Sequence, residues 1–351
     1  MTSTQPTEHT HSLHTPYSRL TPDVVLDALA AVGFDGDGRL MQLNSFENRV
    51  FQVMMEDGSA VVTKFYRPDR WSDEQILEEH AFTLEAAACD VPVVAPMALR
   101  DAGRGRLAAL LSAPSADLPT LARVAVGDLT WRLAVWPRRA GRSPELEDAA
   151  VMHRLGQALA RLHGCGSAGS FQRRERRAPL QDARDALSVI ERSSHLPPDQ
   201  IHGWQRVSEQ VLQAISLRCN THTPAQLRIH GDCHPGNLLW RDDRPNLVDF
   251  DDCATGAAVQ DLWMLLSGEP EAARQQLGWL LDGYTEFRAF DEREIGLIPA
   301  MRLSRMLRHN AWVASRWSDP AFPAAWPDFG RSGYWAQQAL QLQELAAEAL
   351  S

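Results

Sequence analysis

Hydrophobic residues alternate with polar ones in the first part of the chain and follow a helical period in the second part. Two strand-like runs, 49–54 and 60–66, flank a turn at 56–59, a combination typical of a β-hairpin. Helices are predicted after Thr21, which precedes a proline, and from a Ser-Asp-Glu-Gln capping box at Ser72. Further short apolar runs predict strands of the same sheet: 91–96, near 107–112 and near 131–136.

Beyond about residue 143 the pattern is mostly helical, with strongly periodic residues from Ala149 to His163 and a final helix at 334–350. One compact strand–loop–strand segment, 227–252, interrupts the helices. The pattern therefore predicts an α+β fold with two lobes. The expected parts are a flexible tail (1–20), a small β-rich lobe (21–133), a connection (134–143) and a larger helical lobe (144–351).

Composition narrows the classes of function. The net charge of -10 argues against binding of nucleic acid or anionic membranes as the main activity. No apolar run approaches the ~20 residues of a membrane span, and the start lacks a signal-peptide pattern, so a cytoplasmic protein is expected. The scattered cysteines suggest neither disulfides nor zinc. One basic run, 173–177, is interpreted as a solvated face, with a docking patch for an acidic partner as the alternative.

The candidate chemistry lies in the loop His-Gly-Asp-Cys-His-Pro-Gly-Asn, 230–237. Asp232 and Asn237 have the spacing of a kinase catalytic loop, in which the Asp accepts the proton of a hydroxyl and the Asn binds a metal. Asp249 ends a following apolar strand that returns beside the loop, so Asp249 and Asn237 can share one magnesium ion. Two more carboxylates within the next three residues are costly without a cation, which favours a metal site.

Side chains of the first part are candidates for phosphate binding. Lys64 lies in an apolar strand on the same face as Val62, and is either a charge at a sheet edge or a phosphate ligand. Glu78 or Glu79 of the next helix could pair with Lys64 and hold the amine toward the phosphates. No glycine-rich phosphate motif occurs; Ser45 and backbone N–H groups before the hairpin could serve instead, or could form a plain turn.

The 230–237 loop allows other interpretations. A zinc site of His230, Cys233 and His234 would have hard ligands as neighbours and no second Cys/His pair. A nucleophile of Cys233 with His234 would require adjacent residues in a turn to face each other. His234 is better interpreted as a donor toward the transferred phosphoryl group or as a residue that orients the loop.

Together these motifs resemble the aminoglycoside phosphotransferase and choline-kinase-like superfamily. The resemblance runs from about residue 20 through the last helix and is carried by three motifs: 230–240, 247–252 and 260–266. A closer resemblance, to a stress-response branch of bacterial serine/threonine protein kinases, is carried by three further segments: 43–51, 64–71 and 75–80.

The resemblance implies a bilobal protein-kinase-like fold that uses ATP and Mg²⁺. Implied roles by position are Asp232 as catalytic base, Asn237 and Asp249 as magnesium ligands, Lys64 as the phosphate-binding lysine, Glu79 as its helical partner, Ser45 as a contact in the ATP site and Asp261 as a brace of the catalytic loop. Asp251 stands where protein kinases carry a glycine, so an activation-loop switch of the usual kind is not expected.

Three hypotheses about function follow. The first is a kinase that phosphorylates serine or threonine hydroxyls of proteins in a bacterial stress response, expected as a monomer. The second is a small-molecule kinase for an amino alcohol, sugar or aminoglycoside, and the third is a nucleotide-binding pseudokinase, against which the complete set of phosphate-transfer residues argues. A cationic small acceptor favours an acidic, enclosed pocket, and a protein acceptor favours an open groove. Three tryptophans could line the acceptor site or simply form core: Trp312, Trp317 and Trp326.

Overall fold

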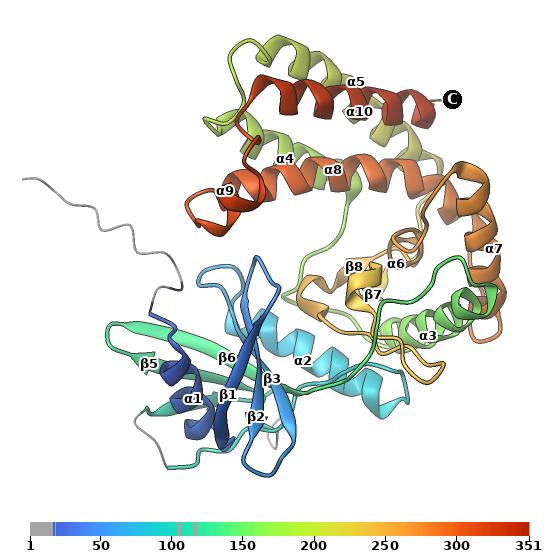
Figure 1. The fold of residues 1–351 in the computed structure, drawn as a ribbon. Coiled ribbons are helices and arrows are strands. Elements are labelled where there is room, and N and C mark those ends of the chain that lie inside the picture. Colours follow the sequence, from blue (N-terminus) through green and yellow to red (C-terminus); the bar gives the residue numbers. More distant parts are fainter. Residues whose placement is uncertain (1–16, 18, 104–106, 115–117, 351) are drawn as a thin grey trace, which may run out of the picture.

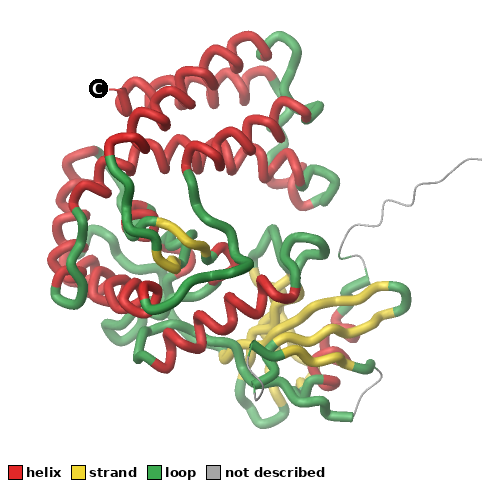
Figure 2. The backbone as a smooth tube through the Cα atoms, turned by 180° about the vertical axis from the view of Figure 1, so that it is seen from behind, coloured by secondary structure: helices red, strands yellow, loops and turns green. Residues whose placement is uncertain are grey.

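The computed structural model describes residues 17, 19–103, 107–114 and 118–350, which form two lobes (Figure 1, Figure 2). The small lobe contains most of the strands and the large lobe is mostly helical, which confirms the predicted α+β organisation. Nearly all of the predicted tail lies outside the described residues, but Tyr17 within it is buried and stacks on Trp131, with ring centroids 5.4 Å apart. No helix in the described ranges is long and apolar enough to cross a membrane.

The small lobe is built on a 6-stranded antiparallel sheet with the strand order β1-β2-β3-β6-β5-β4. Its strands are β1 (Gly36–Leu43), β2 (Arg49–Met55), β3 (Ala60–Phe65), β4 (Ala109–Ser112), β5 (Leu121–Val126) and β6 (Leu129–Pro137). The predicted hairpin is confirmed as β2 and β3, and two other predicted strands as β4 and β6. Since β6 ends within the segment predicted to connect the lobes, the sheet extends into that connection; the domain boundaries stay a prediction.

One helix covers each face of this sheet. Successive side chains of a strand point to opposite faces, and β6 shows the result: Leu133 belongs to the core under α1 (Pro22–Ala31), whereas Ala134 belongs to the core under α2 (Asp73–Ala88). Both helices begin where the sequence predicts. Thr21 accepts from the backbone N–H of Val24, and the capping box at Ser72 is complete.

The prediction that segment 91–96 is a strand of this sheet is wrong. Its prolines, Pro92 and Pro96, have no N–H to donate to a ladder. Instead Val93 forms a single parallel bridge with Leu247 of the large lobe. The sequence also missed β1 and β5, and β1 has mostly exposed side chains that give no clear alternation.

The large lobe consists of helices around a short two-stranded ladder. The helices are α3 (Ala149–Ser167), α4 (Pro179–Arg192), α5 (Ile201–Thr221), α6 (Val259–Trp263), α7 (Pro270–Thr285), α8 (Ile298–Ser315), α9 (Ala321–Ala325) and α10 (Ser332–Leu350). The ladder pairs β7 (Leu227–Ile229) with β8 (Ala254–Gly256). In Figure 1, α5 and α10 lie above α4 and α8, and these four helices share one apolar core.

Helices α3 and α7 approach each other closely because two glycines lie between them. A Cβ atom at Gly156 would lie 1.9 Å from the carbonyl oxygen of Leu280, and one at Gly283 would lie 1.9 Å from that of His153. Such distances leave no room for a side chain. The close contact fixes α3, which also carries His163, a side chain in contact with Asp261 next to the 230–237 loop.

We predict opposite effects for two Gly→Ala substitutions within α3. Gly156→Ala should lower the free energy of unfolding by about 1–3 kcal/mol or more, because the new methyl group meets backbone atoms. Gly164→Ala, in the same helix but with open space around it, should raise it by about 0.5–1 kcal/mol. Midpoints of urea-induced unfolding measure both, and equal effects would contradict the close contact of α3 with α7.

Candidate active site

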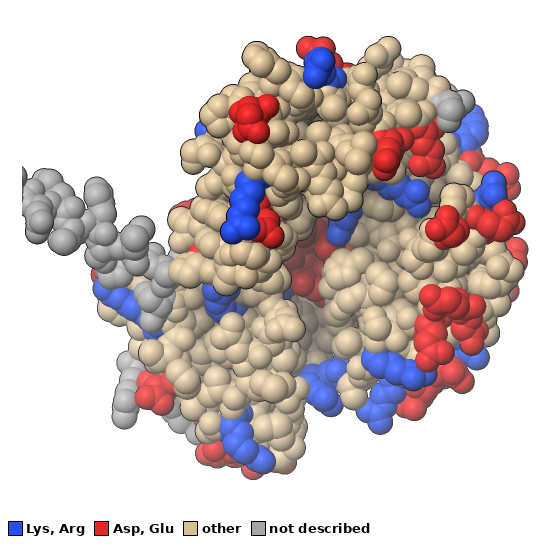
Figure 3. All heavy atoms as spheres, turned by 45° about the horizontal axis from the view of Figure 1, so that its top comes forward, with Lys and Arg blue, Asp and Glu red and all other residues tan. Residues whose placement is uncertain are grey.

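A cavity of about 350 Å³ lies between the sheet of the small lobe and the 230–237 loop. Its lining includes the apolar side chains of Val50, Val62, Val94, Trp136, Leu239 and Val248. Polar groups also line it, among them Ser45, Lys64, Glu79, Asn237 and Asp249. In the space-filling view, acidic atoms lie deep in the hollow between the lobes, with basic atoms beside them (Figure 3). A cavity lined by both apolar and charged groups suits a ligand with a flat ring and a polyanionic tail.

Lys64 is a buried cation in the interior of the sheet. Strand β3 pairs with β2 on one side and β6 on the other, which excludes the interpretation of Lys64 as a charge at a sheet edge. Its Nζ donates to Asp249 Oδ1 at 2.7 Å and lies 3.7 Å from Asp251 Oδ1. Although burial opposes the charge, these carboxylates raise the pKa of Lys64 above its usual value. The amine is therefore a permanent cation that faces the cavity.

Asp261 fixes the start of the 230–237 loop through hydrogen bonds. The backbone N–H groups of His230 and Gly231 each donate to its carboxylate at 2.8 Å, and His163 Nε2 of α3 lies 3.0 Å from Asp261 Oδ2. Burial opposes ionisation, but the bond to His163 and its charge lower the pKa of Asp261. Gly231 has a φ of 83°, and a Cβ there would lie 2.2 Å from the carbonyl oxygen of Asp252, so only glycine fits.

The loop brings Asp232, Asn237 and His234 together. Asn237 Nδ2 donates to the backbone oxygen of Asp232 at 3.0 Å. His234 accepts from the N–H of Gly236 through Nδ1 at 3.0 Å, and its Nε2 lies 3.5 Å from Asp232 Oδ2, so it orients the loop. The sequence missed Arg305 of α8, whose Nη1 donates to Asp232 Oδ1 at 2.5 Å. Cys233 is buried, and burial raises the pKa of its thiol, which opposes a thiolate nucleophile.

Asp249 lies in a left-handed conformation, with a φ of 60°, directly before a short 3-10 turn, Phe250–Asp252. Its side chain is 49% exposed, whereas that of Asp251 is buried. Asp251 Oδ2 accepts from Asn48 Nδ2 at 3.1 Å and lies 3.0 Å from Arg70 Nη1. The left-handed conformation of Asp249 thus lets its own carboxylate reach the cavity, whereas the carboxylate of Asp251 is buried among Asn48 and Arg70.

Asn237 and Asp249 offer oxygen donors at the same end of the cavity. Across the described residues, no three His, Cys, Asp or Glu side chains are grouped closely enough to hold a metal ion. Magnesium in phosphate sites is usually bound through one or two carboxylates, with phosphate and water oxygens completing the octahedron. A pair of residues with side-chain oxygens beside the buried cation of Lys64 fits that ion.

Glu79 has a different direct partner from the predicted one. It is buried, and its Oε2 lies 3.5 Å from Arg174 Nη2, while Lys64 pairs with the closer carboxylates of the 249–251 turn. Burial raises the pKa of Glu79 to about 7, although the charges of Lys64 and Arg174 oppose this. Glu79 remains near enough to help raise the pKa of Lys64.

The basic run 173–177 is a solvated face only in part, because Arg173, Glu175 and Arg176 are exposed but Arg174 and Arg177 are not. Arg174 is buried and donates to the backbone oxygens of Phe250 at 3.1 Å and Asp251 at 2.8 Å. Glu78 fixes the same run, because the backbone N–H groups at 172–174 donate to its carboxylate. The run is bound to the turn that follows Asp249, because these carbonyl groups need a donor in the protein interior.

Side chains instead of glycines position the connection before the hairpin, residues 44–48. Phe46 packs against an aromatic group of the large lobe, formed by Trp312, Phe322 and Trp326. Glu47 pairs with Arg67 at 3.0 Å and Arg316 at 2.9 Å. Ser45 Oγ accepts from the N–H of Asn48 at 3.3 Å and lines the cavity. The tryptophans singled out in the sequence are partly buried and pack against the core of the large lobe, and Trp317 stacks on Phe329.

The fold and these groups define the class of the protein, a protein-kinase-like phosphotransferase. Residues 39–294 match the phosphotransferase enzyme family, and the chain belongs to this family. It is 38% identical over 322 residues to stress response kinase A of Salmonella choleraesuis, covering 92% of this chain and 91% of the relative. The same values apply to serine/threonine protein kinase RdoA of Salmonella typhimurium. The protein is an ATP-dependent kinase.

A solved structure confirms the predicted kinase-like fold. Amicoumacin kinase hAmiN in complex with AMP-PNP, Ca²⁺ and Ami has a TM-score of 0.66 to this chain at 18% identity, and the match covers 92% of each chain. At that identity the likeness shows the fold alone.

We predict that Arg174→Ala lowers the free energy of unfolding by about 3–5 kcal/mol, because it leaves the buried Glu79 without its cation. The matched control is Arg173→Ala, at an exposed neighbour in the same run, with an expected change of about 0.5 kcal/mol or less. Chemical denaturation of the two variants compares them. Equal midpoints for the two variants would show that Arg174 contributes no more to stability than the exposed Arg173.

Proposed function

We propose that the protein transfers the γ-phosphoryl group of Mg-ATP to serine or threonine hydroxyls of proteins, in a bacterial stress response. The observation that carries this proposal is the arrangement of Lys64, Asn237 and Asp249 around one cavity, with Asp232 in the same loop. The name serine/threonine protein kinase of one relative supports the protein acceptor, and the name stress response kinase of another supports the role. With ATP as donor, a cytoplasmic location is part of the same proposal.

In this mechanism Asp232 accepts the proton of the acceptor hydroxyl as its oxygen attacks the γ-phosphorus. The bond from the γ-phosphorus to the bridging oxygen breaks, and ADP leaves. Lys64 offsets charge on the phosphates, and Ser45 and nearby backbone N–H groups contact them. Mg²⁺ neutralises phosphate charge when bound, and Asn237 and Asp249 would hold it.

The catalytic loop is prepared for this step by its supports. Asp261 and His163 are fully buried and fix the loop from two different helices, so the carboxylate of Asp232 needs little rearrangement to meet a hydroxyl. Arg305 Nη1 donates to Asp232 Oδ1, which fixes the orientation of this carboxylate.

We predict that Asp232→Asn lowers kcat by roughly 10²–10⁴-fold, the usual contribution of a general base, with the Kd for ATP changed about threefold or less. Asp249→Asn should instead weaken binding of Mg-ATP, because a magnesium ligand and the partner of Lys64 are both lost. Transfer from labelled ATP to lysate proteins, and calorimetric titration with Mg-ATP, measure the two effects.

The control for both variants is Asp242→Asn, another aspartate at positive φ but with an 85% exposed side chain that does not line the cavity. It should leave kcat and ATP binding unchanged. Retention of most transfer in Asp232→Asn would contradict the catalytic assignment. A parallel panel of amino alcohols, sugars and aminoglycosides tests the acceptor: transfer to one of these but to no protein would favour the small-molecule kinase.

A further inference from the structure

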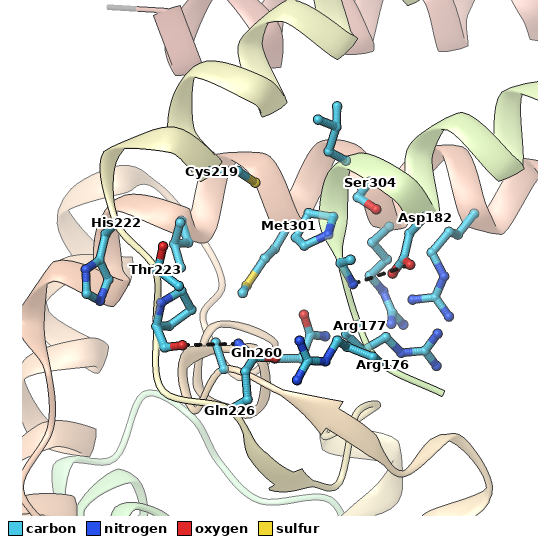
Figure 4. Close-up of a pocket in the computed structure, with 18 residues that line it drawn as sticks. Arg176, Arg177, Asp182, Cys219, His222, Thr223, Gln226, Gln260, Met301 and Ser304 are labelled. Carbon is cyan, nitrogen blue, oxygen red and sulfur yellow. Dashed lines mark hydrogen bonds between the residues drawn. The ribbon is translucent and has the colours of Figure 1, made fainter. Parts of the chain in front are cut away.

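A second cavity, of about 270 Å³, lies in the large lobe beside the 230–237 loop (Figure 4). The segment 176–182, the end of α5 and helix α8 surround it. Gln260 of its lining donates through Nε2 to the backbone oxygen of Gly231 at 3.3 Å. Arg305 lines it too and contacts Asp232. A group bound in this cavity is thus one side chain away from the proposed catalytic base.

The lining of this cavity is strongly cationic. Four arginines contribute to it, Arg176, Arg177, Arg305 and Arg308, but only one carboxylate, that of Asp182. Asp182 Oδ1 accepts from the N–H of Ala178 at 3.4 Å, at the start of α4, and burial raises its pKa. The positive charge of the lining therefore exceeds its negative charge.

Carboxylates next to the cavity are already paired. Asp252 Oδ1 lies 3.0 Å from Arg70 Nη2 and 3.2 Å from Arg177 Nη2, and Asp232 pairs with Arg305. Glu175 lies 3.3 Å from Arg177 Nη1 but is exposed. These pairs leave part of the cationic lining without a counter-charge.

Arg308 is the clearest case. Within the described part of the chain, its guanidinium makes no hydrogen bond and no ion pair within 4.0 Å, although most of its surface is covered. Burial, followed by the charge of Arg177, lowers the pKa of Arg308, although the carboxylates of Asp252 and Asp182 oppose this. The Nε of Arg177 is buried and has no hydrogen-bond partner. A buried donor without a partner is costly, and the partly buried guanidinium of Arg308 lines the same cavity, so this surface favours an anion that accepts from both.

The remaining walls favour an anion that is part of a larger molecule. Leu180, Cys219, Leu297 and Met301 give the cavity an apolar side opposite the arginines, and Figure 4 shows Met301 and Cys219 above Arg176 and Arg177. A free inorganic anion would leave that side without contacts. An acidic or phosphorylated side chain with an apolar stem or neighbour contacts both sides.

We propose that this cavity binds an anionic side chain of the acceptor, a carboxylate or a phosphate, and thereby selects serine or threonine sites beside negative charge. The inference rests on the proposed protein-kinase function and names its substrate class. Aminoglycosides and amino alcohols are cations, and the arginines repel them.

The test compares acceptor peptides that differ only in the side chains next to one serine: Glu, phosphoserine, Gln or Lys. For the wild type, kcat/KM for the Glu or phosphoserine peptide should exceed that of the Gln peptide by roughly ten- to a hundredfold, as expected when charge-assisted hydrogen bonds are gained. Comparison of the Glu and phosphoserine peptides distinguishes carboxylate from phosphate. Equal values for the Glu and Gln peptides would overturn the proposal.

The variant Arg308→Gln should reduce that preference to near unity. Arg302→Gln, at an arginine of the same helix outside the cavity lining, should retain it. A loss of preference in both variants, or in neither, counts against the assignment of the cavity. Circular dichroism of each variant checks that the fold is retained.

Binding separates this inference from the proposed function. A Glu peptide with alanine in place of serine is titrated into the wild type and into Arg308→Gln, with calorimetric detection. Binding that depends on Arg308 supports the anion site even if no peptide is phosphorylated, in which case the protein-kinase function fails by itself. Equal binding to both proteins, or none to the wild type, overturns the inference.

Discussion

Buried and partly buried charges around the Asp249–Asp252 turn are the constraint on which the rest of the active site depends. The group consists of the cations Lys64, Arg70, Arg174 and Arg177 and the anions Glu79, Asp249, Asp251 and Asp252. A buried ion pair adds little stability by itself, but removing one partner leaves an uncompensated charge that is costly. The charges come from β3, the connection between β3 and α2, α2 itself, the 173–177 run and the turn, so they must assemble in one arrangement. That arrangement positions the proposed metal ligand.

The connection at 44–48 shows the same principle at the other end of the cavity. A glycine-rich loop would approach phosphates with its backbone and remain mobile. Here Phe46 lies among aromatic rings of the large lobe, and Glu47 pairs with Arg316 next to them. Any movement of this connection away from the large lobe must break both contacts, so closure of the lobes and the position of the connection are coupled.

The parts of the structure that the sequence predicted have local causes. The capping box at Ser72 and the spacing of Asp232 and Asn237 can be recognised because the interacting residues lie within a few positions of each other. The contacts of Arg174 and Arg305 join residues 76 and 73 positions apart, and an arginine in a polar run or helix looks solvated in sequence. The strand prediction for 91–96 was wrong for the same reason. Val93 forms its bridge with Leu247, which is far away in the sequence, and not with a strand of the sheet.

The net charge of the whole chain is negative, whereas the charge of the cavity lining proposed to bind the acceptor is positive. The whole chain carries a net charge of -10, which repels an anionic acceptor at long range. Salt screens that repulsion beyond roughly 8–10 Å at physiological ionic strength. In the proposed binding mode, an anionic acceptor would meet Arg305 and Arg308 at contact distance in a partly buried cavity, where screening is weak and each interaction is stronger. Acceptor choice would then follow from the local arginines and not from the net charge of the chain.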